Sequence, residues 1–401
     1  MSDGRRRPEL QGVRGVAVSA VVGFHALRLV LAREGGDWGD VSPMWWWAGT
    51  GRLAVDAFFV LAGFLVVASW RTCRARARST GAAVAEYARR RGWRILPPYL
   101  AMLAVMAPLA APGWTDLLRL LTLQQYLDPQ LPAEVNVPIW SLTTEVHFYL
   151  VAPAVAWLLA RIGGWQLVLP AAVLAVWWAH TGARGDLAPS LLPGRLDQFL
   201  VGAAAGTLIA RWEAGLPSRL VRALTTRGAL GGLLAALLLV GTYHGATHQS
   251  GRAGLLPHLV HPVAGVVLAG LVVRLTCGPA PRLCLHPALT WLGGISFSLY
   301  LWHYPILDVG LAQVGPSQPS SVVVLITLLL VAAGIGVATI AHSLVERPAA
   351  RRARARAARL PVLEPELRLQ DPQEVTPAEG DEARRAGGGR ADDAVVHVQL
   401  T

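Results

Sequence analysis

The chain has 401 residues, of which 53% are hydrophobic and only 15% are charged, and its mean hydropathy is +0.43. Several apolar stretches are longer than the core helices of a water-soluble domain, so the composition excludes an ordinary soluble protein and indicates a polytopic membrane protein. The formal net charge of +11 rests on arginine alone, because the chain contains no lysine, and we expect no nucleic-acid partner from it.

Ten apolar runs along the chain have about the length that a helix needs to cross a bilayer. They cover residues 13–32, 52–70, 95–111, 138–160, 165–180, 196–210, 228–243, 257–275, 289–309 and 321–342. We therefore expect an all-α fold, a polytopic bundle of about ten transmembrane helices. With the N-terminus in the cytoplasm, 29 of the 36 arginines fall in cytoplasmic segments, as the positive-inside rule requires. The sequence thus predicts a multi-pass protein of a bacterial plasma membrane with both termini in the cytoplasm.

The composition changes directly after residues 346–348, which ends the predicted membrane domain, 1–348. Residues 349–401 are first rich in arginine and then mixed in charge, with too few apolar side chains to form a core. We expect a disordered cytoplasmic tail whose proximal arginines lie on anionic membrane lipid.

The first predicted span contains two ionisable side chains, Arg14 and His25. A helix rises 1.5 Å per residue, so they lie about 16 Å apart along its axis and on one face. Arg14 alone could reach the cytoplasmic headgroups, whereas His25 lies too far along the span to do so. Because an ionisable group inside a membrane is costly and usually functional, His25 is the first candidate catalytic residue.

The predicted loop 71–94 contains eight arginines, more than orientation requires. Guanidinium groups bind phosphates through paired hydrogen bonds, so the arginines of residues 89–94, next to the third span, could hold a phosphorylated donor. Binding of lipid headgroups explains the same charges equally well.

Two carboxylates occur inside predicted spans, Asp56 in the second and Glu145 in the fourth. We expect Asp56 to pair with His25 on the preceding helix, with Arg52 or Arg195 as the alternative partner. Glu145 is a second candidate, since a carboxylate next to lipid is kept only where it has a partner.

The remaining polar groups give weaker signals. Tyr300 and His303 are neighbours on one face of the ninth span, where a polar stripe packs helices more often than it performs catalysis. Two histidine pairs have a spacing compatible with a metal ion but lack a nearby third ligand, so we expect solvated side chains and no metal site: His244 with His248, and His258 with His261.

Seven segments occur in the order found in one family of membrane enzymes. They are the R-x10-H pattern of Arg14 and His25, AVDAFFVLAGFLV (54–66), RRRGWRILPPYL (89–100), PIWSLTTEVHFYLVAP (138–153), GRLDQFLVG (194–202), SFSLYLWHYPI (296–306) and ERP (346–348). Through these segments the chain resembles the membrane-bound acyltransferase-3 family over residues 8–348.

The resemblance implies an enzyme that moves an acyl group, commonly acetyl, from cytoplasmic acyl-CoA to a hydroxyl of a glycan or a secondary metabolite. It implies that Arg14 and His25 form an essential pair, and that Arg91 and Arg94 form the family's R-x-x-R element for the donor. Further candidate site residues come from the same segments: Trp140, Tyr300 and His303.

Two segments depart from the family pattern. Ala62 stands where the family usually has serine, and Val146-His147 stands where it usually has Glu-Gln. Both changes can reshape the acceptor pocket without removing a core residue.

The resulting hypothesis is an O-acyltransferase in which Arg91 and Arg94, together with Arg14, hold the donor and His25 acts deeper in the bundle. His25 can deprotonate the acceptor hydroxyl or take the acyl group itself, and the sequence leaves both routes open. We expect Asp56 or Glu145 to orient its imidazole. A secondary transporter with intramembrane proton-relay residues is the alternative from a different class, and an inactive regulatory relative is a third.

Overall fold

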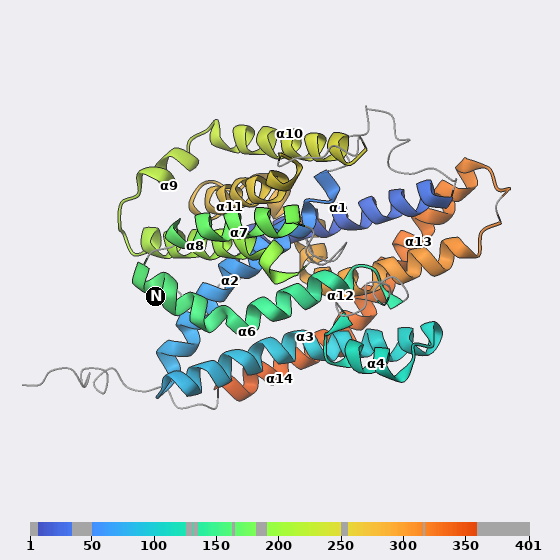
Figure 1. Ribbon diagram of the computed structural model, residues 1–401, viewed down its shortest axis with the longest axis horizontal. Helices are drawn as coiled ribbons and strands as arrows, with labels where there is room; N and C mark the ends of the chain where they lie inside the picture. Colours follow the sequence, from blue (N-terminus) through green and yellow to red (C-terminus); the bar gives the residue numbers. More distant parts are fainter. Residues whose placement is uncertain are drawn as a thin grey trace, which may run out of the picture. The chain divides into compact units, whose positions relative to one another are not determined.

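The computed structural model describes residues 7–33, 50–125, 131, 135–162, 165–181, 191–249, 256–315 and 317–358, and its regular elements there are all helical (Figure 1). The long helices are α1 (Pro8–Arg33), α2 (Ala54–Arg76), α3 (Thr80–Ala110), α6 (Ile139–Ile162), α7 (Trp165–Thr181), α8 (Leu196–Glu213), α10 (Ala229–Gln249), α11 (Val260–Cys277), α12 (Pro287–Ala312) and α13 (Ser320–Ala341). The shorter elements are α4 (Trp114–Leu121), α9 (Arg219–Leu224), α14 (Arg347–Ala358), 3₁₀ turns at Leu192–Gly194, Leu256–Leu259 and Arg282–Leu285, and a π-helical turn at His342–Glu346.

Each of the ten predicted spans coincides with one of the long helices. In the described part of the chain, seven helices are long and apolar enough to cross a membrane, and α7 is a shorter apolar helix. The predicted all-α fold of a membrane helix bundle is therefore confirmed. The number of crossings and the side on which the termini lie stay predictions.

Helix α3 begins at Thr80, well before the predicted span at residue 95. The hydroxyl of Ser79 caps it by accepting a hydrogen bond from the backbone N–H of Ala82, at 3.1 Å. Arginine and alanine are good helix formers, so the arginine-rich stretch is helical although it is too polar for lipid. Within it Glu86 binds both Arg89 and Arg90, at 2.6 Å each, which neutralises part of the positive charge.

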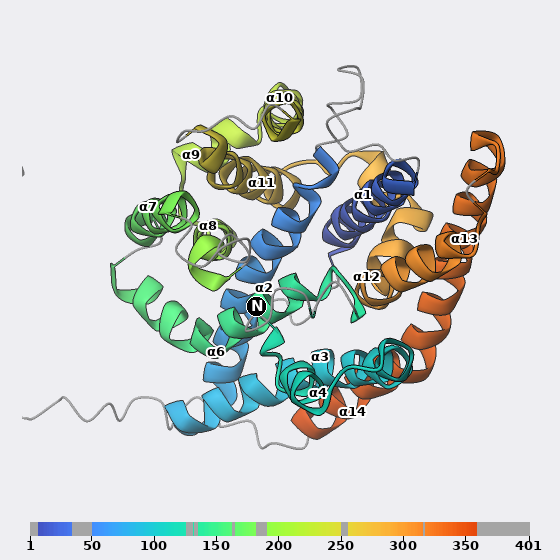
Figure 2. The same ribbon diagram turned by 45° about the vertical axis from the view of Figure 1, so that its right-hand side comes forward.

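Helix α2 lies at the centre of the bundle. It contacts α1 on one side and α8 and α11 on another, and α12 packs against α1 (Figure 2). Helices α3 and α6 also contact α2, and α13 packs on α12. One interior is therefore shared by α1, α2, α3, α6 and α12.

Two helix pairs approach each other backbone to backbone at glycines. Gly15 of α1 and Gly293 of α12 face the partner helix so closely that a Cβ on either would collide with a carbonyl oxygen. Gly63 of α2 and Gly202 of α8 are in the same situation. Small residues of this kind let membrane helices pack closely, so these contacts fix the spacing of α1 to α12 and of α2 to α8.

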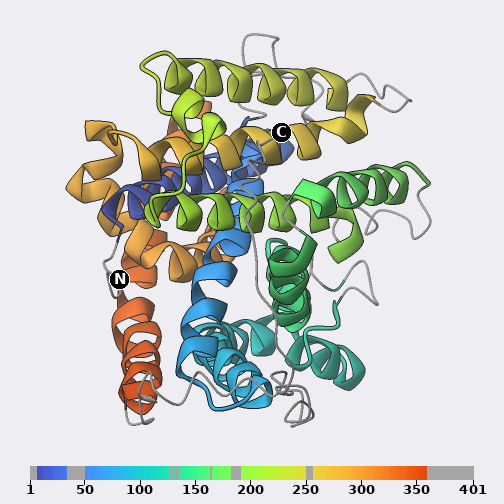
Figure 3. The same cartoon turned by 90° about the vertical axis from the view of Figure 1, so that its left-hand side faces the viewer.

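The folded region continues past the predicted boundary at residue 348. Helix α13 passes through the π-helical turn into α14, the red helix of Figure 3, which packs along α3. Ala349 and Ala353, one turn apart on α14, are buried, and Arg89 of α3 donates a hydrogen bond to the carbonyl of Ala353 at 3.4 Å. The prediction of disorder is wrong for residues 349–358, because an Ala/Arg sequence has high helix propensity and its alanine stripe finds a partner helix. The rest of the predicted tail lies outside the described residues.

Candidate active site

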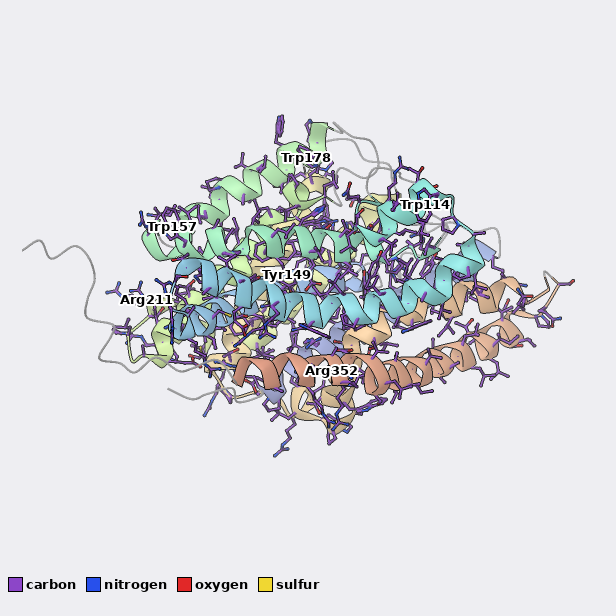
Figure 4. The ribbon with its side chains drawn as sticks, turned by 90° about the horizontal axis from the view of Figure 1, so that it is seen from below. Trp114, Tyr149, Trp157, Trp178, Arg211 and Arg352 are labelled. Carbon is purple, nitrogen blue, oxygen red and sulfur yellow. The ribbon has the colours of Figure 1, made fainter. Side chains whose placement is uncertain are left out.

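A cavity lies between α1, α2, α3, α6 and α12. It offers about 60 Å³ to water-sized molecules, which is room for a few of them. Its polar wall consists of Arg14, Arg94, Ser141, Glu145, Tyr149, Ser296 and Tyr300, and its apolar wall of Val55, Phe58, Phe59, Leu61, Ala62, Leu65, Ile95, Leu142 and Phe297. Figure 4 labels Tyr149 near the middle of the view, between Trp157 and Arg211 toward one end and Trp114 toward the other.

Two of the predicted donor arginines, Arg14 and Arg94, line this cavity. Arg14 donates a hydrogen bond to Ser296 Oγ at 2.8 Å, whereas Arg94 has no hydrogen bond or ion pair within the described residues. Glu145 accepts a hydrogen bond from the Tyr149 hydroxyl and attracts Arg14 electrostatically, so it faces the cavity rather than His25. The two guanidinium groups of the polar wall suit an anion or a polarised carbonyl oxygen.

Arg91, the third predicted donor arginine, lies behind the cavity wall. Its guanidinium lies 4.6 Å from the ring centre of Tyr149 and 5.4 Å from that of Tyr87, and it donates to the carbonyl of Leu65 at 3.3 Å. These cation–π contacts hold Tyr149 in the wall of the cavity. The predicted direct contact of Arg91 with the donor stays a prediction.

His25 lies farther along α1 and is not among the residues that line the cavity. Its ring lies against those of His303 and Tyr304 of α12, with centroid distances of 5.3 and 5.2 Å. Tyr300, which does line the cavity, has its ring centre 5.9 Å from that of His303. His303 and Tyr300 therefore connect His25 to the cavity along one face of α12.

The hydrogen bonds of His303 determine its tautomer. Its Nδ1 lies 3.1 Å from the carbonyl oxygen of Leu299 and 2.9 Å from that of Tyr300. Because both partners can only accept, Nδ1 carries the proton and Nε2 carries a lone pair. Among the described residues, this buried Nε2 has no hydrogen-bond partner, and neither does Nδ1 of the neighbouring His25.

Asp56 does not contact His25, so that expected pair is wrong. The carboxylate is 1% exposed, with Oδ1 3.4 Å from Arg195 Nη1 and Oδ2 2.8 Å from His261 Nδ1. The reason is the direction in which α2 presents Asp56, toward α8 and α11 rather than toward α1. Trp140 belongs to the same group, because the Arg195 guanidinium lies 5.6 Å from the centre of its ring.

Sequence reasoning missed two residues of the interior. His261, expected to be solvated, lies in the first turn of α11 against Asp56, and its ring centre is 5.3 Å from that of His244. Glu346, in the π-helical turn, accepts a hydrogen bond from Ser298 Oγ at 2.7 Å and attracts Arg14 electrostatically. The ERP segment of the sequence contains Glu346, and π-helical turns are frequent at functional sites. Nothing in the local sequence, however, indicates that Glu346 contacts α12.

Comparison with known proteins gives one family and several relatives. A sequence profile described as an acyltransferase domain matches residues 7–343. The chain is 28% identical to the membrane-bound transacylase BcsY of Komagataeibacter xylinus, over 75% of this chain and 72% of that protein. It is 27% identical to the acyltransferase MdmB of Streptomyces mycarofaciens, over 75% of this chain and 81% of that protein. It is 22% identical to the peptidoglycan O-acetyltransferase OatA of Listeria monocytogenes, over 85% of this chain but only 55% of the relative. No solved structure matches significantly.

Proposed function

Because the chain belongs to the acyltransferase-3 family and is a membrane-bound acyltransferase, we propose that it takes an acyl group, most simply acetyl, from cytoplasmic acyl-CoA and transfers it to an acceptor hydroxyl. The observation that carries the proposal is the cavity lined by Arg14, Arg94 and Glu145. The earlier alternative of a secondary transporter is not retained, since the three relatives are named as a transacylase, an O-acetyltransferase and an acyltransferase.

In this proposal the acyl donor binds in the cavity. Acyl-CoA is anionic at its phosphates and presents a thioester carbonyl at the other end of an extended arm. Arg94 suits either group, because its guanidinium reaches the cavity and has no partner of its own among the described residues. Arg14, held by Ser296, supplies a second positive charge to an oxygen that becomes negative as the thioester is attacked.

The acceptor hydroxyl lies at His25. In this proposal the acceptor oxygen attacks the thioester carbonyl carbon while its proton passes to Nε2 of His25. The C–S bond then breaks, and the leaving sulfur takes that proton, which gives the ester and free CoA. General-base assistance of this kind contributes about 10²–10⁴-fold to the rate. Tyr300 lies between the cavity and His303, so we place the meeting point of the two substrates beside it.

His303 takes the orienting role that was expected of Asp56 or Glu145. The two ring centres lie 5.3 Å apart, and in this proposal a small rotation lets the Nε2 lone pair of His303 accept the Nδ1–H of His25, which leaves Nε2 of His25 free to act as the base. The arrangement corresponds to a catalytic triad in which a neutral imidazole replaces the carboxylate that orients the base.

The donor site is tested by acetyl-CoA binding to the purified full-length protein in detergent. Arg94→Gln should weaken binding by at least about tenfold, the loss of one charge-assisted contact. Arg90→Gln is the matched control, because Arg90 pairs with Glu86 on the same helix and does not line the cavity. Equal affinity of wild type and Arg94→Gln contradicts the donor site.

The catalytic pair is tested by acetyl-CoA-dependent acylation in membranes, detected by mass spectrometry of the products. His25→Ala should lower the rate by about 10²–10⁴-fold in protein that still elutes as a folded monodisperse peak. His303→Gln, which keeps an acceptor oxygen near Nε2, should retain more activity than His303→Leu. Full activity of folded His25→Ala removes the assignment of the base, and equal activity of the two His303 variants removes the orienting role.

A further inference from the structure

Two arginines flank His25 on the side away from the cavity. Arg28 follows His25 by three residues on α1, so the two side chains share one helix face. Arg52, directly before α2, lies with its guanidinium 5.7 Å from the ring centre of Phe24, and that ring lies 5.4 Å from the ring of His25. The base of the proposed reaction therefore has two cations near it.

Among the described residues, these two cations have no counter-charge in contact with them. Neither Arg28 nor Arg52 forms an ion pair within the described residues, and the two repel one another. Asp56 is already held by Arg195 and His261, and Asp308, one turn beyond Tyr304 on α12, makes no ion pair there either. Arg52 is half-buried and Arg28 is exposed, and a bound anion would relieve the repulsion between the two guanidinium groups.

The position of these arginines strengthens the argument. The predicted topology places Arg28 and Arg52 at the non-cytoplasmic end of the bundle, where only seven of the 36 arginines fall. The positive-inside rule disfavours arginine at that end, so orientation in the membrane does not explain why two of the seven border His25.

We propose that the acceptor carries an anionic group, a carboxylate or a phosphate, which Arg52 and Arg28 bind so that a nearby hydroxyl of the acceptor lies at His25. Arginine suits both anions because its donors match two oxygens at once. This inference rests on the proposed function and adds the substrate class and the side from which the acceptor arrives. The donor, also anionic, occupies the opposite end at Arg94.

The first experiment reads the charge of the natural product. Membrane lipids, glycans and secreted metabolites of cells with the wild-type protein are compared by mass spectrometry with those of cells with His25→Ala. We expect the species that gain an acyl group to contain a carboxylate or a phosphate, and their fragmentation identifies which. A neutral acylated product overturns the inference and leaves the proposed function intact, whereas the absence of any acylated product overturns both.

The second experiment uses a matched pair of acceptors with the purified full-length protein and acetyl-CoA. Octyl β-D-glucuronide and octyl β-D-glucoside differ only in the carboxylate, and we expect kcat/KM to be at least about tenfold higher for the glucuronide. Arg52→Gln should lower this ratio toward one. Arg119→Gln removes a positive charge from the same predicted side, where Arg119 pairs with Asp116 at 2.9 Å, and should leave the ratio unchanged.

Three results of the second experiment contradict the inference. A wild-type ratio near one means that the carboxylate is not recognised. An equal loss of kcat/KM for both acceptors in Arg52→Gln means that Arg52 has only a structural role. Weaker acetyl-CoA binding in Arg52→Gln means that the arginine serves the donor. If the protein acylates neither glycoside, the charge of the natural product decides the question.

Discussion

Asp56→Asn separates a structural role of this carboxylate from the catalytic role that its position in the sequence suggested. The substitution keeps the shape of the side chain and removes its negative charge. Arg195, whose side chain is 8% exposed, then lacks its counter-ion, and the single amide oxygen replaces only one of the two oxygens that contact Arg195 and His261. We therefore expect the protein to lose stability and to keep its chemistry.

The size of the effect follows from the geometry. Removing one partner of a buried ion pair costs about 3–5 kcal/mol, because the other charge stays buried. The Asp56–Arg195 distance of 3.4 Å is long for such a pair, and His261 is 24% exposed and can be rehydrated, so we expect the lower end, about 3 kcal/mol. That value corresponds to a roughly hundredfold change in the folding equilibrium.

The assay combines unfolding and turnover. The free energy of unfolding is measured in mixed detergent micelles with increasing sodium dodecyl sulfate, and kcat is measured per folded protein. The double variant Asp56→Asn/Arg195→Gln should be less destabilised than the sum of the two single variants, since it no longer contains an unpaired buried cation. A normal unfolding free energy together with a hundredfold loss of kcat would refute this reasoning and show that Asp56 takes part in the reaction.

Two further substitutions test the packing around the site. Gly293→Ala should abolish the normal α1–α12 contact and lower the yield of folded protein, because the added Cβ would collide with the carbonyl oxygen of Gln11. Gly294→Ala, which has open space at its Cβ, should behave as wild type in size-exclusion chromatography. Equal yields of the two variants would contradict the close contact. Tyr300→Phe removes the hydroxyl that lies 2.6 Å from Ser141 Oγ and should lower the unfolding free energy by about 1–3 kcal/mol, so an unchanged unfolding curve contradicts this hydrogen bond.

The long helices were predictable because insertion into lipid depends on composition over about twenty consecutive residues. The ends of helices were less predictable. Helix α3 starts at Thr80, and α14 forms at all, because helix propensity and packing on a neighbour act where hydropathy gives no signal. Residue type singled out Arg14, whose charge is costly in lipid, and the family resemblance singled out Arg94; both line the cavity.

The partners of the polar residues were not predictable from local patterns. Arg14 and Ser296 are 282 residues apart in the chain, and no periodicity within either helix indicates that they meet. The expected pairing of Asp56 with His25 assumed that consecutive helices share their polar faces. A rotation of α2 about its own axis decides this, and that rotation is set by packing on α8 at Gly63 and Gly202.

The glycine contact between α1 and α12 also restricts how the protein can move. With Gly15 and Gly293 seated against the opposite main chain, neither helix can slide or roll past its partner without steric conflict. We therefore expect His25 and His303 to keep their separation when substrates bind. A rearrangement that admits one substrate and releases the other would then take place where α2, α3 and α6 border this helix pair.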